Sequence, residues 1–203
     1  MVDKSVGKIK DNAGVIKSTM DLIYGFQSSR LVFSAIELGI FEYFHQSNCP
    51  QTARDVSENL STNIAATFRF LDALVGLGFL CCEIPDDKNS EKVTYTNSAD
   101  TEQFLITSSP DSIVPLAKSS AIVYPMFMHL EWAVREGKSQ WERVMSNFPG
   151  DFFQKVYQSE EKMVEFMGCM HGTLRQSRSW ILQSFDLSEY NTICDLGGKL
   201  YFK

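Results

Sequence analysis

The chain has 203 residues, of which 44% are hydrophobic and 22% are charged. This composition is ordinary for a globular protein with a sizeable core, and the length corresponds to one domain or slightly more. The formal net charge of −6 argues against a nucleic-acid partner, because binding to a phosphate backbone needs a concentrated surplus of Lys and Arg.

The cysteines and the N-terminus indicate whether the chain is a disulfide-bonded, secreted or membrane protein. The five cysteines are odd in number, contain no CxxC pair and lie mostly in apolar stretches, which predicts buried, reduced thiols and neither a metal site nor a disulfide framework. The polar N-terminus lacks the apolar core of a signal peptide, and no stretch approaches roughly 18 consecutive apolar residues. We therefore expect a cytoplasmic chain with no membrane partner. The cysteines are Cys49, Cys81, Cys82, Cys169 and Cys194.

The first part of the chain is predicted to be helical. Ile16, Met20, Ile23 and Tyr24 recur at helical spacing, and Gly25 then provides a stop or a kink, which predicts an exposed arm with one apolar face. Residues 28–45 are apolar nearly all round the expected helix, so this second helix must be covered on more than one side.

Residues 52–95 have the pattern of a winged helix. Thr52 is the expected N-cap of a short helix over 52–60, and Asn63 opens a second helix that ends at Gly76 and Gly78. Residues 79–84 and 92–95 are predicted strands around a polar loop. Such a module either packs or reads DNA, and the single cation of its second helix, Arg69, favours packing.

Helices are predicted again from residue 112. One spans residues 112–136 and ends at Gly137, a short piece follows over 141–145, and a long helix spans 159–184 with Ser159 as its N-cap. Residues 191–196 then form a short β-prone segment followed by Gly197 and Gly198. Glycines at the end of a strand allow a tight turn and the approach of backbone amides to a ligand.

Several segments, in order and with similar spacing, resemble the acetylserotonin O-methyltransferase family. They cover most of the chain from about Tyr24 onward: ELGIFEYF at 37–44, LVGLGFL at 74–80, YTNS at 95–98, AVREGKSQW at 133–141, VYQSEEKMVEFM at 156–167 and FDLSEYNTICDLGG at 185–198.

The resemblance implies a mainly α fold. A winged-helix-like dimerisation domain with its β-wing is expected over 1–110, a helical lid over 111–190, and over 191–203 the first strand of a truncated Rossmann-like domain that binds S-adenosylmethionine. The N-terminal helices would interlock with a second protomer, giving a homodimer or a heterodimer with a full-length relative. An intertwined interface of this kind would also explain the apolar character of residues 28–45.

The family's cofactor motif begins correctly and then departs. Asp195, Gly197 and Gly198 match it, but Lys199 and Tyr201 stand where further glycines belong. We expect the chain to stop just as the cofactor domain begins, without the family's acidic ribose-binding residue or its catalytic His, and to bind S-adenosylmethionine weakly or not at all.

The family reaction is an in-line methyl transfer to a hydroxyl of a small aromatic acceptor, with a base that deprotonates the hydroxyl. The three histidines, His45, His129 and His171, do not match that base, and we interpret them as structural or surface residues. We therefore assign no catalytic and no metal-ligating residue in this chain.

Partial binding sites remain by resemblance. Tyr157 matches a tyrosine that contacts the cofactor, and Phe166 and Met170 match positions that clamp the aromatic acceptor; core packing is the alternative for all three. Leu174 replaces a tryptophan of the animal enzyme and Lys162 an aromatic of the plant pattern, which leaves the acceptor open.

Three functions follow from these observations. The first is a truncated O-methyltransferase that dimerises but does not catalyse alone. The second is a non-catalytic partner that modulates a full-length methyltransferase. The third is a winged-helix DNA binder, against which the acidic charge counts.

Overall fold

Helices make up most of the chain that the computed structural model describes, which is residues 12–86, 92–145, 153, 156–184, 186, 188, 190–192 and 194. A small antiparallel sheet with strand order β1-β3-β2 is inserted among them. The elements are α1 (Asn12–Glu37), α2 (Ile40–Ser47), β1 (Gln51–Thr52), α3 (Ala53–Asn59), α4 (Ile64–Gly76), β2 (Leu80–Glu83), β3 (Thr94–Asn97), α5 (Ala99–Phe104), α6 (Val114–Phe127), α7 (Leu130–Glu136), α8 (Trp141–Val144) and α10 (Glu160–Ser184).

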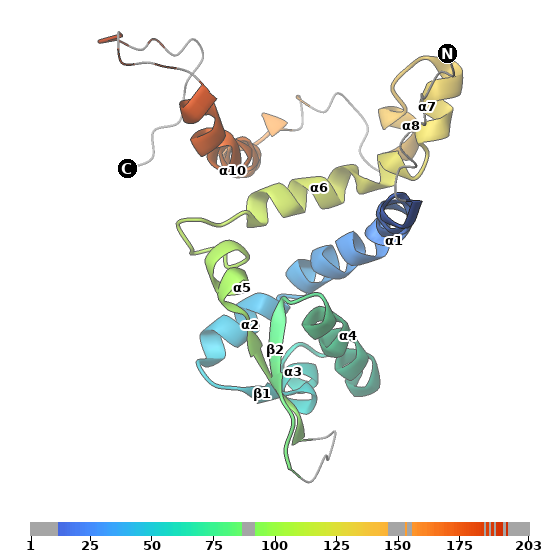
Figure 1. Ribbon diagram of the computed structural model, residues 1–203, viewed down its shortest axis with the longest axis vertical. Coiled ribbons are helices and arrows are strands. Elements are labelled where there is room, and N and C mark those ends of the chain that lie inside the picture. Colours follow the sequence, from blue (N-terminus) through green and yellow to red (C-terminus); the bar gives the residue numbers. More distant parts are fainter. Residues whose placement is uncertain are drawn as a thin grey trace, which may run out of the picture.

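The elements form a body crossed by a single helix. The sheet, helices α2 to α5 and the C-terminal half of α1 make the body, and α6 runs above it (Figure 1). Helices α7 and α8 lie at one end of α6, and α10 lies at the other. The fold is thus mainly helical with a small three-stranded sheet, as far as the described residues extend.

The predicted stop at Gly25 was wrong. Helix α1 continues through Gly25, where a side chain would meet nothing within 4 Å, because an isolated glycine costs a helix only about 1 kcal/mol. The break comes instead at Gly39, whose φ of +74° is the left-handed conformation that glycine adopts without strain. Residues 28–45 therefore belong to two helices, α1 and α2.

The predicted helix pair at residues 52–78 was confirmed. The Thr52 hydroxyl accepts a hydrogen bond from the Asp55 amide, and the Asp55 carboxylate accepts one from the Thr52 amide at 2.8 Å, forming a capping box at the start of α3. The Asn63 side chain caps α4 by accepting a hydrogen bond from the Ala66 amide at 3.0 Å. Gly78, with a φ of +81°, ends α4 with the hydrogen bonds of a Schellman motif.

The two predicted strands were confirmed with shifted bounds, as β2 and β3. They pair with Cys82 opposite Tyr95, and residues 87–91 at the hairpin tip lie outside the described residues. The sequence missed β1, in which Gln51 pairs with Tyr95 from the other side of β3. Tyr95 is completely buried, and its hydroxyl donates to an Asp72 carboxylate oxygen at 2.8 Å.

The core lies between α2, α4 and the sheet. It contains Ala35, Ile40, Phe41 and Phe44, so much of the apolar surface of residues 28–45 is covered by this same chain. The explanation of this apolar stretch by an intertwined interface was therefore wrong for these side chains.

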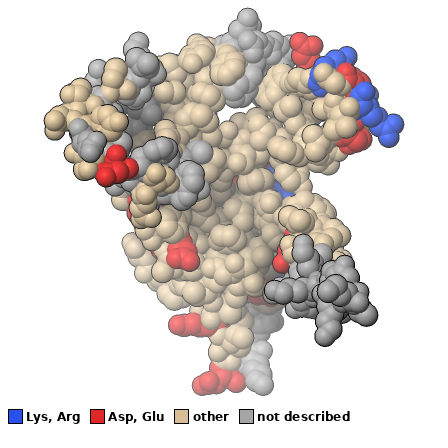
Figure 2. Space-filling view, turned by 45° about the horizontal axis from the view of Figure 1, so that its top comes forward, with Lys and Arg blue, Asp and Glu red and all other residues tan. Residues whose placement is uncertain are grey.

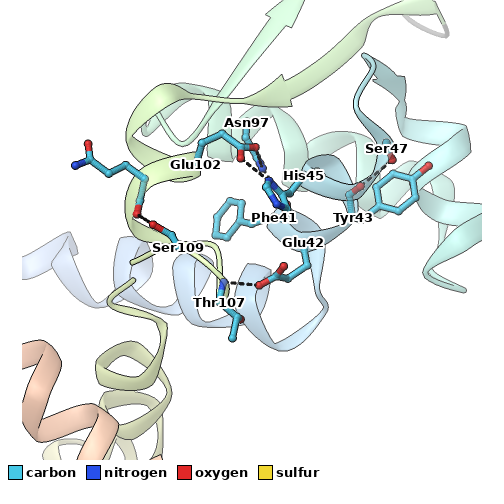
Figure 3. A network of polar contacts seen from close by, with 10 residues as sticks. Phe41, Glu42, Tyr43, His45, Ser47, Asn97, Glu102, Thr107 and Ser109 are labelled. Carbon is cyan, nitrogen blue, oxygen red and sulfur yellow. Dashed lines mark hydrogen bonds and ion pairs between the residues drawn. The ribbon is translucent and has the colours of Figure 1, made fainter. Parts of the chain in front are cut away.

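Polar contacts join α2 to the sheet and to α5 around this core. The Asn97 side chain donates to the Phe41 carbonyl at 2.9 Å and to Glu102 at 2.7 Å, and the same Glu102 carboxylate lies 2.6 Å from His45 Nδ1 (Figure 3). Glu42 of α2 accepts a hydrogen bond from the Thr107 amide at 2.7 Å. These bonds fix α2 against the segment that leads to α6.

The predicted helix over 112–136 is in fact two helices, α6 and α7. Pro125 lies inside α6, two residues before its end, and the chain turns at Met128 before α7 begins. Proline cannot donate its backbone hydrogen bond, so the ladder weakens at this point. The predicted end at Gly137 was confirmed, because Gly137 has a φ of +64°.

The prediction that the cysteines are mostly buried was wrong. Cys49, Cys81 and Cys194 are exposed and Cys82 is half-buried, so only Cys169 is a buried thiol.

The predicted strand over 191–196 stays a prediction. Its described residues Asn191, Thr192 and Cys194 do not pair with another strand, and the rest of this segment lies outside the described residues.

Candidate dimer surface and lid helix

The N-terminal half of α1 exposes large apolar side chains over more than half of its circumference. Successive residues of a helix are about 100° apart around its axis, so neighbours at positions 22, 23, 24 and 26 cannot share one face. Leu22 is 80% exposed. Such a segment needs a cover that the described residues do not provide. We call it the arm, and its exposed apolar residues are Met20, Leu22, Ile23, Tyr24 and Phe26.

A second exposed apolar set lies where α6 turns into α7. It comprises Phe127, Met128, Leu130 and Val134, with Phe127 69% and Val134 77% exposed. We call it the turn patch. The arm and the turn patch lie at the same end of the molecule (Figure 1), and α6 packs on α1 through an edge-to-face contact of Phe33 with Tyr124 at 6.0 Å.

The sequence identified only part of this surface. It predicted the arm as exposed with one apolar face, and the structure confirms the exposure but adds Leu22 and Phe26 outside that stripe. These two residues were the available signal, because apolar side chains off the main stripe are unexpected on an amphipathic helix. The turn patch was not predicted, because residues 112–136 were expected to form one continuous helix.

Helix α10 and the turn before it carry the predicted lid residues. Tyr157 lies in the turn and is 62% exposed, and Met170 is 42% exposed, so neither is in the core of this chain. Phe166 is half-buried and contacts Phe153 edge-to-face with ring centres 6.3 Å apart. Met163, Met170 and Leu174 are all exposed, and their spacing places them on one face of α10. This face is open to a ligand or to further protein.

The other predicted site residues are not placed. Asp195, Gly197 and Gly198 lie outside the described residues. Among the residues that the structure does describe, no three His, Cys, Asp or Glu side chains are grouped to hold a metal ion. Nor does any described helix combine the length and apolar character needed to cross a membrane.

The contacts of His45 and His129 are structural. His45 lies beside Glu102, as described above, and His129 stacks on Trp132 with ring centres 4.0 Å apart. The guanidinium of Arg143 lies 3.8 Å from the centre of the same Trp132 ring. His171 is half-buried on α10.

A small cavity lies beside Gly39 at the break between α1 and α2. Its volume is about 70 Å³, with Phe41 and Val114 among its apolar lining and Glu42 and Lys118 among its charged lining. Pockets for cofactor-sized ligands have volumes of about 300–1,000 Å³. This cavity therefore has room for a few water molecules but not for a cofactor or an aromatic acceptor.

The charge distribution does not favour DNA binding by the helix pair. Figure 2 shows Lys and Arg gathered at one corner, next to acidic residues. At the corner formed by α7 and α8, Glu136 pairs with Lys138 at 3.4 Å and with Arg143 at 3.0 Å. Helix α4, which would have to read the bases, carries Arg69 as its one cation.

Two family models match this chain. Residues 20–107 match an O-methyltransferase dimerisation domain, and residues 127–200 match an O-methyltransferase domain. The first match includes the exposed arm.

Named relatives agree with these matches. Acetylserotonin O-methyltransferase of Gallus gallus is 35% identical over 191 residues, which are 89% of this chain and 54% of the relative. The enzyme of the same name from Rattus norvegicus is 33% identical over 88% of this chain and 40% of its own length. The chain thus spans about half the length, or less, of these relatives.

Solved structures show the same arrangement of elements. Human N-acetylserotonin methyltransferase in complex with SAM superposes with a TM-score of 0.72 and 28% identity, covering 90% of this chain and 51% of that one. The mitomycin 7-O-methyltransferase MmcR, at 20% identity and a TM-score of 0.63 over 88% of this chain and 50% of its own, shares the fold. The chain belongs to the acetylserotonin O-methyltransferase-like family of S-adenosylmethionine-dependent O-methyltransferases.

Proposed function

We propose that this chain is the dimerisation and lid region of an O-methyltransferase that transfers a methyl group to a hydroxyl of a small aromatic acceptor. The observation that carries the proposal is the arm, which is exposed, apolar over more than half of its circumference, and included in the match to the dimerisation domain. A second copy of the chain is the cover that such a segment requires.

The proposed division of the chain follows the sequence prediction. Residues 1–110 form a winged-helix-like dimerisation domain, residues 111–190 form the lid, and residues 191–203 begin the cofactor domain. The winged helix acts as a packing module, which is supported by the burial of Leu71 and Leu74 of α4 against the body.

The lid is proposed to contact both ligands. Tyr157 would contact S-adenosylmethionine together with Asp195, Gly197 and Gly198, and Phe166 and Met170 would hold the acceptor ring. Exposed aromatic and thioether groups suit these roles, because they pack on flat rings and offer favourable sulfur contacts. The cofactor supplies a methyl group on a sulfonium cation. Lys199 would add a like charge near that cation, so we expect the affinity of this chain for the cofactor to be weak.

Sedimentation velocity and isothermal titration test the proposal together. We expect the purified chain to sediment as a dimer, and titration with S-adenosylmethionine to give no heat up to millimolar concentration. A monomer at all concentrations would contradict the dimerisation role. Micromolar binding would contradict the expected weak affinity for S-adenosylmethionine. It would also make this chain a candidate for an active methyltransferase.

The variant Leu22→Gln tests whether the dimer forms through the arm. Its glutamine keeps the side-chain length but removes apolar area, so the variant should sediment as a monomer at concentrations where the unmodified chain is dimeric. Ile84→Gln is the matched control, because Ile84 is also exposed but lies at the end of the hairpin. Equal effects of the two substitutions would contradict the assignment.

A further inference from the structure

Helix α10 rests on α6 through two glycines. A Cβ atom added at Gly168 would lie 3.4 Å from Pro115 Cβ and 3.6 Å from its Cγ, and one added at Gly172 would lie 3.8 Å from Leu116 Cβ. Glycines four residues apart lie on one face of a helix and let a neighbouring helix approach closely. Cys169, between them, is buried. The contact is therefore closer than larger side chains would permit.

The same helix α6 holds the dimer surface at its other end. Pro115 and Leu116 lie in its first turn, whereas Tyr124, which contacts Phe33 of α1, lies about 13 Å further along at about 1.5 Å per residue. The turn patch follows directly at Phe127. Figure 1 shows α6 running between α1 and α10, with the arm at one end and the lid helix at the other.

We propose that α6 couples dimer assembly to the position of the lid helix, and that Gly168 and Gly172 are the positioning residues of this coupling. A second copy that covers the arm and the turn patch restrains α6, and the glycine contact passes that restraint to α10. The residues affected are Phe166 and Met170, which lie on the same helix and move with it. This inference rests on the proposed dimerisation.

The coupling must be reciprocal. If the dimer favours the docked position of α10, then a change that undocks α10 weakens the dimer by the same factor. Coupling of this kind is typically worth about 5- to 150-fold in an equilibrium constant. A leucine at position 168 extends beyond Cβ into Pro115 and should undock α10 without breaking the helix, because leucine favours helices. An alanine only makes an ordinary contact there.

Amide hydrogen exchange of the full chain tests this proposal. In the unmodified chain, protection of residues 160–172 should increase as the concentration passes from monomer to dimer. In Gly168→Leu this increase should disappear and the dimer dissociation constant should rise at least about 5-fold, whereas Gly168→Ala should keep both properties. Gly76→Leu is the matched control, since nothing lies within 4 Å of a Cβ at Gly76.

Each outcome separates the coupling from the dimerisation itself. A dimer in which α10 exchanges at the same rate as in the monomer would overturn the coupling and leave the proposed dimerisation intact, whereas a monomer at all concentrations would overturn both. If Gly168→Leu fails to fold, Phe33→Leu loosens the other end of α6 and should also remove the dependence of α10 exchange on concentration. Persistence of that dependence in Phe33→Leu would overturn the proposal.

Discussion

The hydroxyl of Tyr95 is a buried polar group whose contribution can be measured. Burial raises the pKa of Tyr95 above its usual value, and its hydrogen bond to Asp72 raises it further. Tyr95→Phe removes this bond but keeps the ring, so we expect the free energy of unfolding to fall by about 1–2 kcal/mol. Urea unfolding measures this loss. Tyr190→Phe, on an exposed residue, should change stability by less than about 0.5 kcal/mol; equal losses would contradict the assignment.

The capping box of α3 should make stability depend on pH. Hydrogen bonds from the Thr52 hydroxyl and amide lower the pKa of Asp55. Because the folded pKa lies below the unfolded one, the stabilisation is present above about pH 4 and is lost as the pH falls through the folded value. Asp55→Asn should therefore cost about 1 kcal/mol at pH 7 and less near pH 3 in urea unfolding. A pH-independent cost would contradict this account, and Asp86→Asn serves as the control.

The two glycines of the first two helices should respond in opposite ways to alanine. Gly25 lies inside α1 with open space around it, so Gly25→Ala should raise the free energy of unfolding by about 0.5–1 kcal/mol. Gly39 has a φ of +74°, so Gly39→Ala should lower it by about 1–2 kcal/mol. Urea unfolding of both variants checks the position of the helix break. Stabilisation by both would place the break elsewhere.

Elements with local signals could be predicted from the sequence, and the others could not. Thr52, Asn63 and Gly78 cap their helices through neighbours a few residues away, so the helix pair could be read directly. The choice between Gly25 and Gly39 as the break depends instead on the burial of Ile40 and Phe41 in the core, which the local pattern does not contain. Strand β1 has two residues, too few for a periodic signal.

The residues of the candidate site also divide into those that the sequence indicates and those that only the structure reveals. Tyr157, Phe166 and Met170 came from the resemblance, and the sequence left open whether they pack in the core. Tyr157 and Met170 are exposed in the described chain, and the exposure of Met170 depends on which face of α10 turns toward α6. That face is set by Gly168 and Gly172, whose role becomes visible only when Pro115 and Leu116 are placed beside them.

At the scale of the whole molecule, the arm and the turn patch are expected to belong to one interface between two copies. In a two-fold symmetric dimer each substituted residue occurs twice. Loss of a buried apolar side chain costs about 1.5–3 kcal/mol, so the two copies together lose about 3–6 kcal/mol, which raises the dissociation constant by at least about 100-fold.

The variant Phe127→Gln tests whether the turn patch shares the interface with the arm. Phe127 is 69% exposed on the isolated chain, so its substitution should leave the unfolding of the monomer nearly unchanged. Sedimentation velocity over a range of concentrations should show the dissociation constant raised as for Leu22→Gln. Because both residues would act on one equilibrium, the melting temperature of either variant should lose the concentration dependence expected of the unmodified dimer. An unchanged dissociation constant in Phe127→Gln would mean that the dimer interface contains the arm but not the turn patch. The turn patch would then bind another partner.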